Sequence, residues 1–479
     1  MKKLTALLLV LVFILSVAFC PATATDINLD NRTSSAVAQI YSEAFSVIAQ
    51  GLRNNETYIS IKEQYIPSKH LSRVFESVII ENPDIFYVNP YSLEYAVNIE
   101  NGFVSHIKPT YFFEADEIAE KKQKFNSAVE YYLSGVDASW SNYKKCRYIH
   151  DLLASTIEFD TDFNNNKSEV FTAYGALVDN VAISQGYALA YNYLMNKLGI
   201  EALYIENNGK FHSWSMVKLG ENYYHVDVVG DDPSDDLLGR ILHDYCLISD
   251  KKLKSLRTDF SWIADYQATN TRFDNAWWSG VDTFIFTADS KDYYIDNNYK
   301  DGKCGAFLCY EEASDSHSLL YKIEDKWYVN KENNQFWSGS FSSLAFDGNL
   351  FYFNTPDGVY SIKSTGKGRT LFYERPSSQK LDMFGIATLS DGIIYAEYRE
   401  DPMIDGIVFS VDSKESIYKI GDVNTDGVTD IKDVTRLQKS LISKLMLSSK
   451  QIALADYNKD DEINVNDVTA MQKKLVNIR

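Results

Sequence analysis

The sequence predicts a multidomain protein with a helical N-terminal region, an α+β core, an all-β middle domain and a small α-helical C-terminal module. The chain of 479 residues is too long for one ordinary hydrophobic core. After about residue 275, short apolar runs between Asp-Gly turns replace helical periodicity. Two similar acidic stretches begin at Asp422 and Asp456, 34 residues apart, and each runs into a helical pattern. From these changes we predict domains over residues 25–142, 143–274, 275–418 and 419–479.

Residues 1–24 have the features of a secretory signal. Lys2 and Lys3 precede a long apolar run, and the small residues Ala22 and Ala24 provide a cleavage site after Ala24. We therefore expect the mature protein outside the cell. No later apolar run approaches the ~20 residues that a transmembrane helix needs.

The net charge restricts the possible binding partners, and the number of cysteines restricts the possible disulfides. The formal net charge of −19 argues against nucleic acid or an anionic membrane surface as partner, and it agrees with cation binding. Four cysteines follow the signal, which is sparse for a disulfide framework. Cys304 and Cys309 are close enough in sequence to bridge a hairpin, but free buried thiols explain them equally well.

The N-terminal region shows helical periodicity with one β interruption. Apolar stripes predict one helix over residues 34–52 and another that Pro83 ends. Alternation over residues 92–113 predicts a hairpin around Asn101-Gly102. A further helix is expected through Glu130.

The core is organised around residues 171–233, which read as a loop, a helix and two strands. Ser184 stands at the start of the helix, His212 early in the first strand and Asp227 late in the second. A hydroxyl, an imidazole and a carboxylate in this order provide a nucleophile, a base and an orienting group if the strands fold beside the helix. A serine in this position is also a favoured helix N-cap. His150, on an amphipathic helix over residues 143–159, is interpreted as a surface histidine.

Three motifs in this stretch resemble the transglutaminase-like superfamily: SQGYA from Ser184, HSW from His212 and HVDVVGDDP from His225. The resemblance implies an α+β, papain-like cysteine-protease-type core, with His212 as base and Asp227 as orienting group. Two positions depart from the family. Ser184 replaces the nucleophilic cysteine, and Gly230 stands where the family usually has an aromatic residue.

The replacement at Ser184 decides the expected chemistry. A cysteine is already partly ionised near neutral pH, whereas a serine hydroxyl must lose its proton during attack and needs better alignment with its base. We favour a catalytically degenerate site over a working serine hydrolase, and both over a purely structural cap.

The middle domain is expected to be a sandwich or partial propeller built of hairpins. Trp327 and Trp337 would suit a carbohydrate platform, but tryptophans in β domains mostly belong to the core, and we assign them there. The sequence does not reveal what this domain does.

The two C-terminal acidic stretches carry oxygen ligands at the spacing that a calcium loop requires. Positions 1, 3, 5 and 12 are acidic or amide residues in both copies, position 7 supplies a backbone carbonyl, and position 9 of the first copy acts through water. The expected ligands are Asp422, Asn424, Asp426, Val428, Asp430 and Asp433 in the first loop, and Asp456, Asn458, Asp460, Glu462 and Asp467 in the second. Asp461 occupies position 6, where glycine normally makes the turn, so we expect two calcium sites of which the second is weaker.

These paired loops resemble a type I dockerin, which implies calcium-dependent binding to the cohesin module of a scaffoldin in a cellulosome at the cell surface. By that resemblance, the docking faces are the helices after each loop, beginning at Ile431-Lys432 and Val465-Asn466. The residue pairs differ, so the two faces need not be equivalent.

Together these features predict a secreted, cellulosome-associated accessory protein with a calcium-loaded dockerin and an inactive transglutaminase-like cleft for peptides or proteins. One alternative is an active Ser-His-Asp hydrolase or protease. A second is a polysaccharide-degrading or carbohydrate-binding subunit, because dockerins usually accompany such modules.

Overall fold

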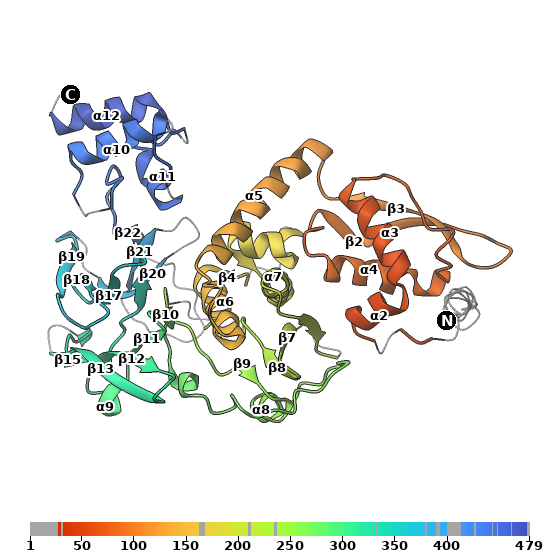
Figure 1. Ribbon diagram of the computed structural model, residues 1–479, viewed down its shortest axis with the longest axis horizontal. Coiled ribbons are helices and arrows are strands. Elements are labelled where there is room, and N and C mark those ends of the chain that lie inside the picture. Colours follow the sequence, from red (N-terminus) through yellow and green to blue (C-terminus); the bar gives the residue numbers. More distant parts are fainter. Residues whose placement is uncertain are drawn as a thin grey trace, which may run out of the picture.

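The structure is a computed structural model, and it describes residues 27–29, 32–161, 168–208, 212–233, 237–330, 334–378, 381–388, 393–399, 413–425, 428–442, 444–447, 449–460 and 462–476. The expected secretory signal lies outside the described residues. Figure 1 shows the N-terminal helices and the C-terminal helices on opposite sides of the α+β core.

The N-terminal region combines helices with a small antiparallel sheet of strand order β1-β3-β2. The Asn101-Gly102 hairpin is confirmed, and Gly102 adopts the positive φ of +76° that the turn needs. The elements are α2 (Ser34–Ile40), α3 (Ser42–Arg53), β1 (Ile59–Ser60), η2 (Ser68–His70), α4 (Leu71–Glu81), β2 (Val88–Val97), β3 (Val104–Tyr111) and α5 (Ala115–Ser134).

The prediction of a single helix over residues 34–52 is wrong, because the helix is interrupted at Tyr41. Its φ of −115° and ψ of 37° lie outside the helical range. The Tyr41 hydroxyl lies 2.6 Å from Nδ1 of His70, and both side chains are buried. This tertiary contact accompanies the break, and the apolar periodicity, which continues across Tyr41, does not reveal it.

The α+β core packs one helix on a four-stranded antiparallel sheet of order β6-β7-β8-β9. Helix α7 lies against β6 and β7, and it buries Tyr187, Tyr191 and Leu194. The elements are α6 (Asn142–Thr156), β4 (Glu158–Phe159), η3 (Ser168–Phe171), η4 (Gly175–Asp179), β5 (Val181–Ala182), α7 (Ser184–Lys197), β6 (Ala202–Glu206), β7 (Ser213–Leu219), β8 (Asn222–Val226), β9 (Cys246–Ile248) and α8 (Asp250–Leu256).

The region after the core consists of small antiparallel sheets, each formed from consecutive strands. The sheets are β10-β11-β12-β13, β14-β15, β16-β17-β18-β19 and β20-β21-β22. Whether they form a sandwich or a partial propeller stays a prediction. The elements are η5 (Trp277–Gly280), β10 (Phe286–Ala288), β11 (Lys291–Asp296), α9 (Tyr299–Gly302), β12 (Gly305–Glu311), β13 (Ser316–Ile323), β14 (Tyr328–Asn330), β15 (Gln335–Phe336), β16 (Leu344–Phe346), β17 (Phe351–Thr355), β18 (Gly358–Ile362), β19 (Thr370–Glu374), β20 (Asp382–Thr388), β21 (Ile394–Arg399) and β22 (Ser413–Ser416).

The structure shows where Trp327 and Trp337 of this β region lie and whether its two cysteines form a disulfide. Trp327 is fully buried and its indole N–H donates to the carbonyl of Met383 at 2.6 Å, so it belongs to the core. Trp337 packs beside the same cluster. Cys304 and Cys309 are both free thiols.

The C-terminal module contains α10 (Ile431–Leu441), α11 (Ser449–Ala455) and α12 (Val465–Leu475). Helices α10 and α12 pack on each other through Val434, Leu437, Val468 and Met471. Leu454 on α11 joins the apolar cluster of the adjacent β region. Among the described residues, no helix has both the length and the apolar character needed to cross a membrane.

Candidate functional site

Ser184 is the first residue of α7, and Ile183 alone separates it from the short strand β5. The N-cap is Ile183, with an extended φ of −96° and ψ of 176°, so the assignment of Ser184 as the helix cap is wrong. Ser184 is buried. The backbone N–H groups in the first turn of α7 have no carbonyl acceptor within the helix, because no helical turn precedes them. This is the position in which a nucleophile and hydrogen-bond donors for a bound carbonyl lie side by side.

His212 and Asp227 come together through the β7–β8 hairpin. His212 directly precedes β7 and Asp227 directly follows β8, and Nε2 of His212 lies 2.7 Å from Oδ2 of Asp227. Asp227 is almost completely buried, whereas the His212 side chain keeps 19% of its surface exposed. With Nε2 bonded to the carboxylate, Nδ1 is the ring nitrogen that remains to act as a base.

The small size of Gly230 permits the orientation of Asp227. The Gly230 N–H donates to Oδ1 of Asp227 at 3.2 Å. A Cβ at residue 230 would lie 2.9 Å from Cδ2 of Tyr245 and 3.0 Å from Oδ2 of Asp227. The Tyr245 ring therefore fills the space into which a side chain at residue 230 would extend. Tyr245 lies outside the three sequence motifs, and no pattern in the sequence indicates that it reaches the site.

The ring of His212 rests on aromatic neighbours that a second histidine holds in place. Trp214 stacks on His212 at a centroid distance of 5.8 Å, and Phe260 lies at 5.3 Å. The Trp214 indole N–H donates to Nδ1 of His225 at 3.0 Å, so Nε2 of His225 carries the proton that faces Asp250 at 2.8 Å. Burial lowers the pKa of His225, which agrees with a neutral ring. His225 thus supports Trp214 and is a hydrogen-bonded sheet histidine.

The structure brings two of the three expected catalytic residues into hydrogen-bond contact. Among the described residues, no hydrogen bond joins the Ser184 hydroxyl to His212. The base and its orienting group are assembled, and the serine lies at the helix start without engaging the base. This arrangement can bind a carbonyl group near a polarised imidazole, and it lacks the nucleophile–base contact that defines an activated serine.

The assignment of His150 to the surface is wrong, because Asp231 and His243, in the segment between β8 and β9, pack against its ring. His150 is fully buried between two carboxylates: Nδ1 lies 2.9 Å from Asp151 and Nε2 lies 3.0 Å from Asp231. Burial lowers the pKa of His150, but these two hydrogen bonds outweigh burial and raise the pKa to about 9. Asp151 also contacts His243 at 3.0 Å and accepts the backbone N–H of Ile285.

His150, Asp151 and His243 have side chains of the types that bind metals, and their ligand atoms lie within 4.8 Å of one another. The separations of 2.9 and 3.0 Å are hydrogen-bond lengths, and each ring nitrogen of His150 already faces a carboxylate. We therefore interpret the group as a buried charge network that ties α6 to the β region.

The two C-terminal loops repeat the same backbone geometry. Residue 4 of each loop, Thr425 in the first and Lys459 in the second, has a φ of +61°. Asp430 accepts the Lys432 N–H at 2.7 Å and caps α10, and Asn464 caps α12 in the same way. Asn464 was missed in the sequence, although it occupies position 9 of the second loop.

The residues of both loops fit a calcium ion. Asp433 and Asp467 are fully buried, and each carboxylate accepts backbone N–H groups of its own loop. Within the described ranges, no Lys, Arg or His forms an ion pair with either one. A buried carboxylate without a cationic side chain calls for a bound cation. The expected ligand Asp426 lies outside the described residues, as does Asp461.

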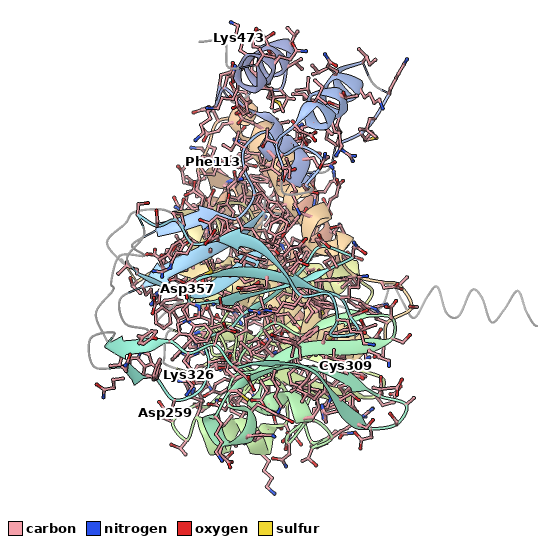
Figure 2. The ribbon with its side chains drawn as sticks, turned by 90° about the vertical axis from the view of Figure 1, so that its left-hand side faces the viewer. Phe113, Asp259, Cys309, Lys326, Asp357 and Lys473 are labelled. Atoms are coloured by element: carbon pink, nitrogen blue, oxygen red, sulfur yellow. The ribbon has the colours of Figure 1, made fainter. Side chains whose placement is uncertain are left out.

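The expected docking residues are accessible on the helices that follow the loops. Ile431 is 63% exposed and Val465 is 65% exposed, which is unusual for large apolar side chains. Both stand at the first position of their helix and have a polar neighbour, Lys432 or Asn466. Figure 2 shows α12, marked by Lys473, well away from Asp357 of the β region.

Comparison with known proteins identifies the C-terminal module. Residues 420–476 match the family model of the Dockerin type I domain, so this is a dockerin-bearing protein. A dockerin implies a cohesin partner and association with a cellulosome, and type I dockerins bind calcium. No curated protein matches the chain.

Two solved structures show weak similarity. One, described as "Crystal structure of a TGase", has 12% identity and a TM-score of 0.21, and covers 29% of this chain and 43% of that chain. The other, described as "Crystal structure of the tricorn protease", has 11% identity and a TM-score of 0.18, and covers 45% of this chain and 21% of that chain. The chain thus spans less than half the length of either structure. Both TM-scores are too low to establish a shared fold for the core.

Proposed function

We propose that this protein is a secreted, cellulosome-associated subunit whose dockerin binds a scaffoldin cohesin through two calcium ions and whose transglutaminase-like cleft binds a peptide or protein without turning it over. The match to the dockerin family supports the first half. The second half rests on one observation: His212 and Asp227 are hydrogen-bonded at 2.7 Å, while Ser184 stands in the nucleophile's position.

A serine in this position weakens catalysis more than binding. The peptide carbonyl still meets the N–H groups of the α7 first turn, and His212 still contributes a hydrogen bond. The attacking oxygen, however, must be deprotonated by a base that it does not contact. The cleft therefore still binds the peptide but does not catalyse attack on its carbonyl group.

Cohesin binding is tested with the full chain and a panel of type I cohesin modules on a biosensor. We expect at least one cohesin to bind in calcium and to dissociate in EDTA. The double variant Asp433→Ala and Asp467→Ala should fail to bind even in calcium. Tight binding that persists in EDTA would contradict the calcium-dependent half of the proposal.

A serine hydrolase is the second candidate, favoured by the intact His212–Asp227 pair with its uncommitted Nδ1. It predicts that a fluorophosphonate reagent labels Ser184, detected by mass spectrometry of the tryptic peptide. Our proposal predicts no label under conditions that fully label a control serine hydrolase. Ser184→Cys is the companion variant, because a gain of amidase activity would show that the nucleophile alone is missing.

A further inference from the structure

A cavity of about 310 Å³ lies between the N-terminal region and the start of α7. Its volume falls at the lower end of the range for ligand-binding pockets. Residues on α4, β2, η3 and α7 form its walls. Apolar side chains in these walls include Ile80, Phe86, Tyr91, Phe112, Phe171 and Leu189.

The cavity is held in a fixed position relative to Ser184. Gln185, the residue that follows Ser184, lines it. The wall formed by residues 168–173 packs directly on the first turn of α7, because a Cβ at Gly186 would lie 2.8 Å from the carbonyl oxygen of Val170 and 3.0 Å from that of Thr172. Only glycine allows this approach, so the wall and the serine belong to one rigid unit.

The chemistry of the cavity favours an apolar group. Among the described residues that line it, Glu76 carries the one formal charge, and Nη1 of Arg73 lies 2.9 Å from its carboxylate. A charged ligand group would lose its hydration there, and the carboxylate of Glu76 is already paired with Arg73. A large apolar side chain would instead exchange water for contact with aromatic and aliphatic walls.

We propose that this cavity receives a large apolar side chain, Phe or Leu in type, of a peptide bound across Ser184. The inference rests on the proposed function, since it assumes a peptide in the cleft, and it adds the residue class that the cleft selects. It also gives the N-terminal region a role, because α4 and β2 supply the wall opposite α7.

Fluorescein-labelled peptides of the form Gly-Gly-X-Gly-Gly test the proposal by fluorescence anisotropy with the full, calcium-loaded chain. With X as Phe or Leu, we expect binding about tenfold or more tighter than with X as Ala or Glu. Tyr91→Ala and Phe171→Ala should reduce this preference. Tyr95→Ala is the matched control, because Tyr95 lies on the same strand, is 52% exposed and does not line the cavity. All three side chains are partly or largely exposed, so each variant should fold.

A second readout locates the side chain. A peptide with p-benzoylphenylalanine as X should cross-link to residues of α4, β2 or residues 168–173. Binding that is independent of X and unchanged by Tyr91→Ala, or cross-links elsewhere, would overturn the inference while leaving a peptide-binding cleft in place. Failure of every peptide to bind would contradict the proposed function, and the inference with it.

Discussion

At the residue scale, the geometry of the cleft depends on how little space Gly230 occupies. A Cβ added at residue 230 would approach Tyr245 and Asp227 more closely than Cβ atoms normally do, so the orientation of Asp227 depends on the missing side chain. In the sequence, Gly230 is only a departure from a position that is usually aromatic in the family it resembles. In the structure, the Tyr245 ring occupies the space that a side chain at residue 230 would need.

We predict that Gly230→Ala displaces Asp227 and weakens its hydrogen bond to His212. Overpacking of this kind costs about 1–3 kcal/mol of folding free energy. Thermal unfolding measures the loss, and the His212 imidazole signals in NMR report the displaced carboxylate. Gly280→Ala is the control, because a Cβ there meets nothing within 4 Å. Equal, negligible effects of both substitutions would contradict this account of Gly230.

His150 makes the stability of the fold depend on pH. Its pKa of about 9 in the folded protein lies above its ordinary value of 6.5, since Asp151 and Asp231 bind the charged ring. The stabilisation is therefore complete below about pH 6.5 and is lost as the pH rises through about 9. Between these values, the free energy of unfolding should fall by about 1.4 kcal/mol per pH unit.

Urea unfolding at several pH values tests this slope, and NMR titration of the wild-type imidazole signals tests the charge directly. His150→Gln should flatten the pH dependence. An imidazole that titrates near pH 6.5 in the folded protein would contradict the assignment. The sequence misplaced His150 because the pattern of one helix does not show which neighbour covers its outer face.

At the scale of helices and strands, the turns and motifs in the sequence predicted the structure more accurately than the apolar periodicity predicted where helices end. The Asn101-Gly102 hairpin and the helix from Ser184 to Lys197 follow from local residue chemistry. The break at Tyr41 coincides with a contact to His70, 29 residues away, which no local pattern contains. The motifs located His212 and Asp227, but Tyr245 reaches the site only through the fold.

The two calcium loops should differ in affinity. Asp461 stands where glycine normally makes the turn, and a left-handed conformation costs a residue with a Cβ up to about 1–2 kcal/mol relative to glycine. We predict two dissociation constants separated by about tenfold in isothermal titration calorimetry. Asp467→Ala should retain the tighter site and Asp433→Ala the weaker one. Two sites of equal affinity would show that Asp461 adopts its turn without strain.

At the scale of the whole molecule, the N-terminal region, the core and the β10-β11-β12-β13 sheet share one continuous apolar cluster, from Leu29 to Tyr310. Domain boundaries placed at changes in residue pattern do not reveal this continuity. The dockerin, by contrast, has its own small core and presents Ile431 and Val465 outward. The apolar core thus continues from the N-terminal region into the β region, while the dockerin has a core of its own and also packs on the β region through Leu454.

The central claim is that the cleft binds peptides and no longer turns them over. It is tested most directly by incubating the full, calcium-loaded protein with an apolar-rich peptide library and following cleavage and cross-linking by mass spectrometry. The account predicts that wild type and Ser184→Ala give the same product levels as a blank without protein. Turnover by the wild type that Ser184→Ala abolishes would contradict it.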